Sequence, residues 1–300
     1  MVNIINAVLD NIKEQIGIPA KLLNLLDNNP CIRAEIAEFP PNISLNSITR
    51  WDQWGTHSIQ NFSDRHPGRL PGWKYSAGSY SSFHFLYPEL ANFGHCETTE
   101  NWTCDIQEIV GFSSSKSKLE DFTSLDGMVE KNSREMIDQL SEAKLDENLS
   151  HSEIRILRHN SSDYFARYRW DGRIFLVNSG GSHHFAAARY IASRIEKKIP
   201  LRGKLKTFSL NTDVVKGFLR DFNIYVINKN SHEAFRKTLE SFKATFLWQD
   251  MPVPYQDTRA IVLPKNEKRS FCISNVLYHA GVFDLGALFS VLCERQRKNT

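Results

Sequence analysis

The sequence predicts a fold of the α/β or α+β class, with a mixed sheet and flanking helices. In the second half of the chain, short apolar runs alternate with amphipathic or alanine-rich stretches, which indicates strands alternating with helices. Clusters of Gly, Pro, Asn and Asp separate these stretches, as is typical of turns. With 300 residues, 41% of them hydrophobic, the chain can bury a sizeable core.

The two halves of the chain differ in composition. We expect residues 1–150 to form a helical and aromatic-rich irregular region and residues 151–300 to form the α/β core, with one continuous domain as the alternative. Residues 2–26 carry apolar side chains at helical spacing that is interrupted at Gly17–Pro19. Two short helices are therefore predicted at the start of the chain.

The segment Phe39–Cys104 is dense in aromatic residues and is punctuated by Pro and Gly, which predicts short strands joined by long ordered loops. Its aromatic side chains could form a binding wall that stacks on a ligand, but filling of a core is the more economical interpretation. The polar stretch that follows predicts an exposed serine-rich loop at Ser113–Lys118 and an amphipathic helix at Met128–Leu145.

The second half predicts a clear order of elements. Asp171-Gly172 is a strong hairpin turn between two of its strands. Strands are expected at Glu153–Arg158, Tyr164–Trp170, Arg173–Val177, Lys204–Leu210, Ile224–Ile227 and 259–263. Helices are expected at Phe185–Lys197, from an Asn211–Asp213 cap to Phe222, at Ser231–Lys243 and at Ala280–Arg295.

Charge and targeting signals limit the classes of protein. The net charge of +3 neither requires nor excludes nucleic acid, and no run approaches the roughly 20 apolar residues of a membrane-spanning helix. The five cysteines are odd in number and scattered, and Cys96 and Cys104 do not match a compact zinc pattern, so reduced thiols and no metal site are expected. We therefore expect a cytoplasmic protein without a membrane partner.

The most informative stretch is the loop that joins the strand at Arg173–Val177 to the alanine-rich helix. Asn178, Ser179, Gly180 and Gly181 form a small-residue turn that leaves backbone N–H groups unpaired at the helix start. Such N–H groups attract anions, and phosphates in particular. The alternative is a tight turn without a ligand.

Three reactive side chains follow directly in this loop. Ser182 stands at the expected N-cap of the helix, and a nucleophilic role beside a histidine is the alternative. The positive end of a helix lowers the pKa of a histidine, so His183 and His184 are candidates for an acid–base role. Ser182, His183 and His184 are therefore the candidate catalytic residues.

Basic residues on the neighbouring strands are candidate phosphate ligands. Arg167, Arg169 and Arg173 occupy odd positions, which share one face of a strand, and Lys204 and Lys206 are expected nearby. An ordinary charged outer face of the sheet is the alternative. For a carboxylate that holds Mg²⁺ or acts as a base, Glu153 and Asp163 are the nearest residues, and the sequence does not select between them.

This arrangement of turn, strand, small-residue loop, histidine and alanine-rich helix, over about residues 171–210, resembles the phosphate-binding motif of the ParB/sulfiredoxin-like superfamily. There the strand ends in Asp-Gly-x-His-Arg or Gly-Gly-Cys-His-Arg. Here Ser182 stands in place of the catalytic Cys and His184 in place of the Arg. The resemblance implies a ParB/sulfiredoxin-like core in the C-terminal half, without sulfiredoxin-type reduction and with a weaker, pH-dependent phosphate contact.

The hypothesis that follows is a soluble bacterial protein that binds a phosphorylated ligand, first of all a nucleotide, at loop 178–185. If it is an enzyme, a nucleotide-dependent phosphotransferase, an NTPase or a nuclease is expected, with Mg²⁺ accompanying the nucleotide. One alternative is a nucleic-acid-binding or nuclease module of a defence or toxin system. A second is a non-enzymatic interaction protein in which the loop is only a turn.

Overall fold

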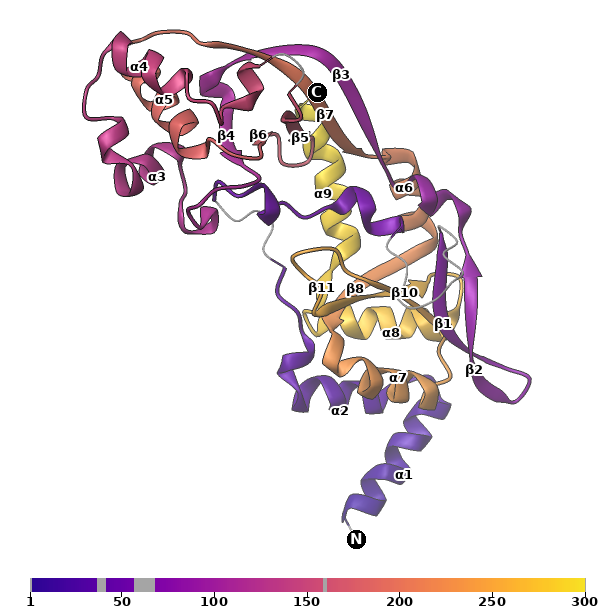
Figure 1. Cartoon of the computed structure of the whole chain (residues 1–300). Coiled ribbons are helices and arrows are strands. Elements are labelled where there is room, and N and C mark those ends of the chain that lie inside the picture. The colour runs from indigo at the N-terminus through magenta and orange to yellow at the C-terminus, as the bar shows by residue number, and fades with distance from the viewer. Residues whose placement is uncertain (1, 37–41, 57–67, 159–160, 300) are drawn as a thin grey trace. The chain divides into compact units, whose positions relative to one another are not determined.

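The computed structural model describes residues 2–36, 42–56, 68–158 and 161–299. The chain divides into two compact units, and Figure 1 labels their elements. Unit 1 comprises Met1–Ala37, Arg50–Gly94 and Leu210–Glu294, and unit 2 comprises Glu38–Thr49, His95–Ser209 and Arg295–Thr300. Each unit has its own sheet and its own helices, which confirms the predicted class in its α+β form.

Unit 1 is built on an antiparallel sheet of six strands in the order β11-β8-β10-β9-β1-β2. A tight turn at Ala77-Gly78, both with positive φ, joins β1 to β2. The strands are β1 (Arg69–Ser76), β2 (Ser79–Leu86), β8 (Phe222–Asn228), β9 (Phe246–Asp250), β10 (Thr258–Pro264) and β11 (Phe283–Asp284). The strands of this sheet come from two stretches of the sequence, one before and one after the central segment His95–Ser209 of unit 2.

Helices cover one face of this sheet. Leu22 and Leu26 of α2 pack with Phe235 of α7 and Ile273 of α8 against the strands, where α2, α7 and α8 lie together (Figure 1). The helices of unit 1 are α1 (Val2–Gln15), α2 (Ala20–Asn28), α6 (Thr212–Asp221), α7 (His232–Ser241), α8 (Lys268–His279) and α9 (Leu285–Lys298), of which α9 ends in unit 2. The two predicted N-terminal helices and the Asn211 cap of α6 are confirmed.

Aromatic side chains fill a second part of the unit 1 core. Trp54 is fully buried and contacts the rings of Phe93, Phe218 and Phe289, with centroids 5.1–5.8 Å apart. This confirms core filling for the first part of the aromatic-rich segment. Residues 39–41 and 57–67 of that segment lie outside the described residues.

Unit 2 is built on a mixed sheet of five strands in the order β3-β7-β5-β6-β4. β5 pairs antiparallel with β6 across the predicted Asp171-Gly172 turn and parallel with β7, while β4 pairs parallel with β6. The strands are β3 (Gly94–Asp105), β4 (Ile109–Phe112), β5 (Tyr164–Tyr168), β6 (Ile174–Val177) and β7 (Pro200–Leu210). The loop of interest leaves the end of β6.

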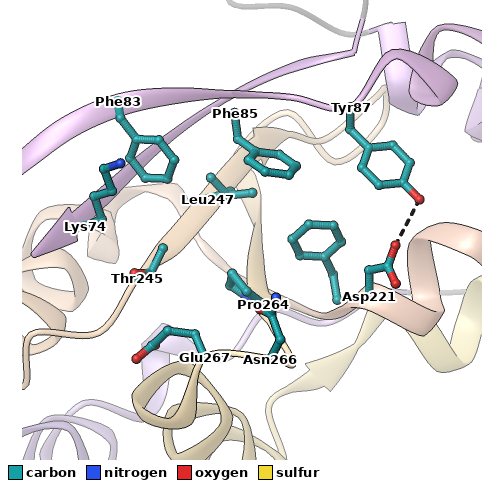
Figure 2. A pocket seen from close by; sticks show the side chains of 11 residues that line it. Lys74, Phe83, Phe85, Tyr87, Asp221, Thr245, Leu247, Pro264, Asn266 and Glu267 are labelled. Carbon is teal, nitrogen blue, oxygen red and sulfur yellow. Dashed lines mark hydrogen bonds between the residues drawn. The ribbon is translucent and has the colours of Figure 1, made fainter. Parts of the chain in front are cut away.

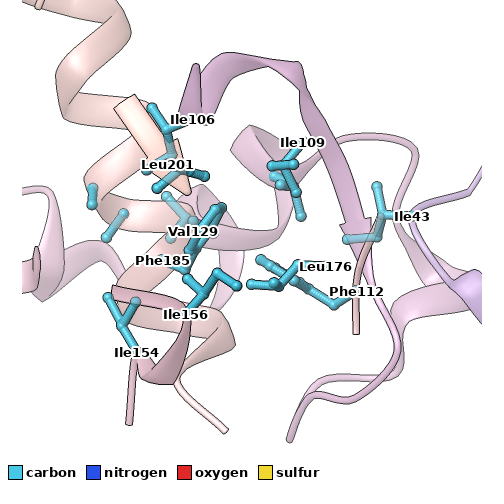
Figure 3. Packing of buried hydrophobic residues seen from close by; sticks show 14 of the residues in the cluster. Ile43, Ile106, Ile109, Phe112, Val129, Ile154, Ile156, Leu176, Phe185 and Leu201 are labelled. Carbon is cyan, nitrogen blue, oxygen red and sulfur yellow. The ribbon is translucent and has the colours of Figure 1, made fainter. Parts of the chain in front are cut away.

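The core of unit 2 depends on the alanine-rich helix α5 (Ser182–Arg194). Phe185 is buried at its start and meets Phe112 edge to face, with ring centroids 5.5 Å apart (Figure 3). The small side chains of Ala186–Ala188 let α5 lie close to α3 (Leu125–Asn132) and α4 (Glu142–Leu149). This packing fixes the helix end from which the histidines project.

Three sequence predictions for single elements are wrong. The helix expected at Met128–Leu145 is two helices, because Ser124 and Ser141 each cap a separate helix start. Glu153–Arg158 is not a strand; its backbone closes a 3₁₀ turn at Arg155–Leu157, and both isoleucines are buried. The final helix begins at Leu285 and not at Ala280, because the chain turns at Gly281 with positive φ.

Several boundaries also differ from the prediction. α5 begins three residues before Phe185, and the strands β9 and β11 and the helix α8 were not predicted. The expected domain boundary near Ser150 falls inside unit 2, between α4 and α5, which pack on each other. Among the described residues, none of the helices is long and apolar enough to cross a membrane.

His232 makes unit 1 sensitive to acid. Burial and, to a smaller extent, the positive charge of Arg259 lower the pKa of this histidine to about 4, against the opposite effect of Glu233 and Asp250. Its Nδ1 is buried without a hydrogen-bond partner. Since the unfolded chain has the ordinary pKa near 6.5, it binds the proton more tightly than the folded chain. Stability is therefore complete above pH 6.5 and is lost as the pH falls from 6.5 towards 4.

We expect the free energy of unfolding to fall by about 3 kcal/mol over this range because of His232. Urea unfolding at pH 7.5 and 4.5 measures this difference. His232→Phe, which keeps a ring beside Trp248, should remove most of it, whereas His279→Gln on the exposed end of α8 should not. An equal loss of stability in His232→Phe and wild type would contradict the assignment.

Candidate functional site

A polar cavity of about 740 Å³ lies at the N-terminus of α5 in unit 2. It is formed where the loop after β6 meets the serine-rich loop after β4 and the segments that flank α3 and α4. The lining residues are Ser114, Ser115, Lys116, Ser117, Asn132, Ser133, Glu135, Met136, His151, Glu153, Ser179, Gly180, Gly181, Ser182, His183 and His184. Of the candidate residues predicted in loop 178–185, all but Asn178 thus line this one cavity.

The glycine pair makes the turn into α5. Gly181 has a φ of 71°, and a Cβ at this position would lie 2.6 Å from the backbone oxygen of Glu153. The same Glu153 accepts the Gly181 N–H with its Oε2 at 3.2 Å. Gly180 is less constrained, because its nearest neighbours would be 3.4 Å from an added Cβ. The turn therefore depends on Gly181, whose N–H already donates to the Glu153 carboxylate.

The first turn of α5 lines the cavity and has unpaired backbone donors. Gly181 is the N-cap and makes no side-chain capping bond, so the expectation that Ser182 caps the helix is wrong. Ser182 Oγ instead donates to Ser115 Oγ at 2.9 Å. The N–H groups of Ser182, His183 and His184 have no acceptor among the described residues. They carry the positive partial charge of the helix end.

Asn178 and Ser179 hold the loop in place. Asn178 is buried, and its side-chain amide donates to the backbone oxygens of Ser114 and Gly180 at 3.0 and 2.9 Å. The N–H and the hydroxyl of Ser179 both donate to the buried carboxylate of Asp163 at 3.2 and 2.9 Å. Asn178 does not line the cavity. It is a positioning residue for the serine-rich loop.

His183 lies between two serine hydroxyls. Its Nε2 is 3.1 Å from Ser117 Oγ, and its Nδ1 makes a short hydrogen bond with Ser133 Oγ. Burial lowers the pKa of His183, and the positive charge of Lys116 lowers it further. With both ring nitrogens bonded to hydroxyls, His183 is held in a fixed orientation as a neutral ring.

His184 has a defined tautomer. The amide nitrogen of Asn148 donates to the backbone oxygens of Met136 and Lys144, so Asn148 Oδ1 can only accept from His184 Nδ1 at 3.1 Å. The proton therefore sits on Nδ1, and the neutral ring keeps a lone pair on Nε2. Burial lowers the pKa of His184, followed by the charge of His151, whose ring stacks on it at 3.6 Å.

The three arginines predicted as phosphate ligands do not line the cavity. Arg173 makes two hydrogen bonds to the carboxylate of Asp171, at 2.7 and 2.8 Å, and a third to a backbone oxygen. Arg169 contacts Glu97 at 3.4 Å, and Arg167 lies over the ring of Trp102. The two lysines expected beside them are also engaged, Lys204 with Glu100 and Lys206 with the ring of Tyr164.

Sequence reasoning missed much of the opposite wall. Lys116 and the hydroxyls of Ser115 and Ser117 come from a run that was predicted only as an exposed loop, and Asn148 and His151 were not singled out. A serine-rich run around a single lysine is a weak signal, because it is also typical of solvated loops. Among the described residues, no group of three or more His, Cys, Asp or Glu side chains is placed to hold a metal ion.

Fold and site together define an α+β protein with a polar, histidine-lined cavity at a helix N-terminus. The chain belongs to the family of unknown function DUF6685, whose model matches residues 99–300. Comparisons with curated proteins and with solved structures found no match. Every residue that lines the cavity falls within the matched range. None of these comparisons points to the ParB/sulfiredoxin-like superfamily, so that resemblance stays a prediction.

The two glycines should respond differently to alanine. Gly181→Ala forces a side chain into the left-handed region and against the backbone of Glu153, so we expect a loss of about 2 kcal/mol in the free energy of unfolding. Gly180→Ala meets only ordinary contacts and should cost about 0.5 kcal/mol or less. Thermal and urea unfolding compare the pair; equal losses would contradict the assigned geometry.

The two histidines should respond to different carboxylates. Glu153 raises the pKa of His184 and Glu135 raises the pKa of His183, each against the larger effect of burial. Glu153→Gln should therefore lower the pKa of His184 further, and Glu135→Gln should lower the pKa of His183 further. NMR titration of the histidine ring protons measures both. A shift of the same histidine by both variants would contradict the arrangement.

Proposed function

We propose that unit 2 binds a phosphorylated small molecule in the cavity at the N-terminus of α5, and that a nucleotide is the class to test first. One observation carries the proposal: three residues with unpaired backbone N–H groups, Lys116 and several serines line the same cavity. Lys116 forms no ion pair with a described residue, so its charge is available to a ligand. Such donors suit the many oxygens of a phosphate.

The size and polarity of the cavity support a phosphorylated molecule of moderate size. A volume of about 740 Å³ lies within the ~300–1,000 Å³ of ordinary ligand pockets. The amide of Asn132 and the hydroxyls of Ser115, Ser117 and Ser182 can bond sugar or phosphate oxygens. Arg169 and Arg173 are bonded to acidic neighbours, which favours a small ligand over a nucleic-acid backbone.

The carboxylate of Glu153 is the one feature that opposes an anion here. It already accepts a hydrogen bond from the Gly181 N–H, so the ligand would use the N–H groups of the next three residues. Glu153 also lies close enough to His184 to raise its pKa. A carboxylate and a neutral histidine beside a phosphate are the groups that acid–base chemistry on a phosphate ester needs.

We assign His184 as the acid–base group of this proposal. Its Nε2 lone pair can take a proton from water as the water oxygen attacks phosphorus and the ester P–O bond breaks. The departing alcohol oxygen then takes this proton from the His184 imidazolium, which completes a hydrolysis and restores the neutral ring. Asn148 acts only as a positioning residue, because it holds the tautomer that leaves Nε2 unprotonated.

Calorimetry tests binding directly. The panel is ATP, ADP, AMP and inorganic phosphate, each with and without Mg²⁺. Lys116→Gln should weaken the binding of the best ligand about tenfold, because a charge-assisted contact is lost. Lys118→Gln in the same loop is the matched control: this lysine pairs with Asp121 and does not line the cavity, so affinity should stay within twofold.

Two further variants separate binding from chemistry. Glu153→Gln removes a negative charge beside the anion and should tighten binding about threefold to tenfold. His184→Gln should keep binding within about threefold while phosphate release from a hydrolysed ligand falls at least tenfold. Absence of binding by any member of the panel to the folded wild type would overturn the proposal. Equal effects of Lys116→Gln and Lys118→Gln on affinity would show that the ligand does not bind in this cavity.

A further inference from the structure

A second, apolar pocket of about 370 Å³ lies in unit 1 (Figure 2). Phe83, Phe85 and Tyr87 form one wall. The other lining residues include Phe222, Leu247 and Pro264. Lys74 stands beside Phe83 at one end, and a Tyr87–Asp221 contact marks the other (Figure 2). The volume is within the range of small-molecule sites, and the surface is mostly aromatic and aliphatic.

Strand alternation builds this wall. Phe83 and Phe85 are two residues apart on β2 and therefore point to one face of the sheet, and Tyr87 continues this spacing just past the strand end. Phe83 pairs in register with Gly72 of β1, where an added Cβ would lie 3.0 Å from the Phe83 ring and 2.5 Å from Leu247. The missing side chain at Gly72 lets Phe83 lie across β1.

This wall is not part of the protein core. The opposite face of the β1–β2 hairpin, with Trp73 and Tyr80, packs against the helix-covered core of unit 1. Phe85 is 36% exposed although it is a large apolar residue. Aromatic side chains that remain open to solvent along one pocket are typical of a binding surface.

The charged residues at the pocket differ in whether another group already binds them. Asp221 pairs with Arg220 at 2.9 Å and accepts from Tyr87, and this pairing lowers the pKa of its carboxyl. Glu267 caps α8 by accepting the N–H groups of Arg269 and Ser270. Lys74 has no carboxylate partner among the described residues; its ammonium lies 4.9 Å from the centroid of the Phe83 ring.

We propose that this pocket is a second ligand site, which takes a small amphipathic anion: a flat aromatic or alicyclic body with one carboxylate or sulfonate. The apolar body packs on Phe83, Phe85 and Phe222, and the anionic group pairs with Lys74. A cationic ligand would find the carboxylates already satisfied and the ammonium of Lys74 repelling it. This site is independent of the cavity in unit 2.

A matched pair of fluorescent probes tests the proposal on the full chain. 8-Anilinonaphthalene-1-sulfonate carries the aromatic body and one anionic group, and N-phenyl-1-naphthylamine is its neutral counterpart. Lys74→Gln should weaken the binding of the sulfonate about fivefold and leave the neutral probe within twofold. Lys237→Gln, an exposed lysine of α7 outside the pocket, should change neither.

The aromatic wall has its own control. Phe85→Ala should weaken both probes about fivefold, because the stacking surface is lost. Phe271→Ala, an exposed phenylalanine of α8 that does not line the pocket, should leave both within twofold. Circular dichroism verifies that each variant is folded.

Three results would overturn the proposal. The first is no binding of the sulfonate to the folded wild type. The second is an equal response of both probes to Lys74→Gln. The third is an affinity for both probes that Phe85→Ala leaves unchanged, which would place the bound probe elsewhere on the molecule.

Discussion

The contact between Gly181 and Glu153 determines how unit 2 can be assembled. Because Gly181 is in the left-handed region with the Glu153 backbone against it, the chain leaves β6, turns and enters α5 in one direction only. That direction carries Phe185 and Ala186–Ala188 into the core and leaves the histidines beside the cavity. The same contact therefore fixes both the packing of the helix and the position of its reactive end.

The fold could be predicted where structure is decided locally. The Asp171-Gly172 turn, the Asn211 cap and the apolar run at Ile174–Val177 each specify their structure within a few residues. The split between α3 and α4 could not be seen from periodicity, because it depends on serine side chains that cap a helix only once the chain has turned. β9 was missed because its apolar run is only three residues long, Phe246–Trp248, and is followed by Gln249 and Asp250.

The candidate site, too, could be predicted only where its residues are close together in the sequence. The loop that carries His183 and His184 could be predicted because its glycines and its helix are contiguous in the sequence. Its opposite wall could not, because Lys116 and His151 become neighbours of the loop only through the pairing of β4 with β6 and the packing of α4 on α5. The arginines were misplaced for a related reason: their position on a strand says nothing about an acidic neighbour such as Glu97, which comes from another strand.

The interleaving of the two units has a consequence for how the chain folds as it is synthesised. β1 and β2 emerge early, but β9, the strand that pairs with β1, follows only after the whole of His95–Ser209 has been made. A hairpin alone is at best marginally stable in water. The apolar side chains of Phe83 and Phe85 on β2 are therefore exposed to solvent until β9 has been synthesised. The central segment of unit 2, by contrast, contains its complete sheet and can form first. The central segment can therefore fold before the sheet of unit 1 is complete.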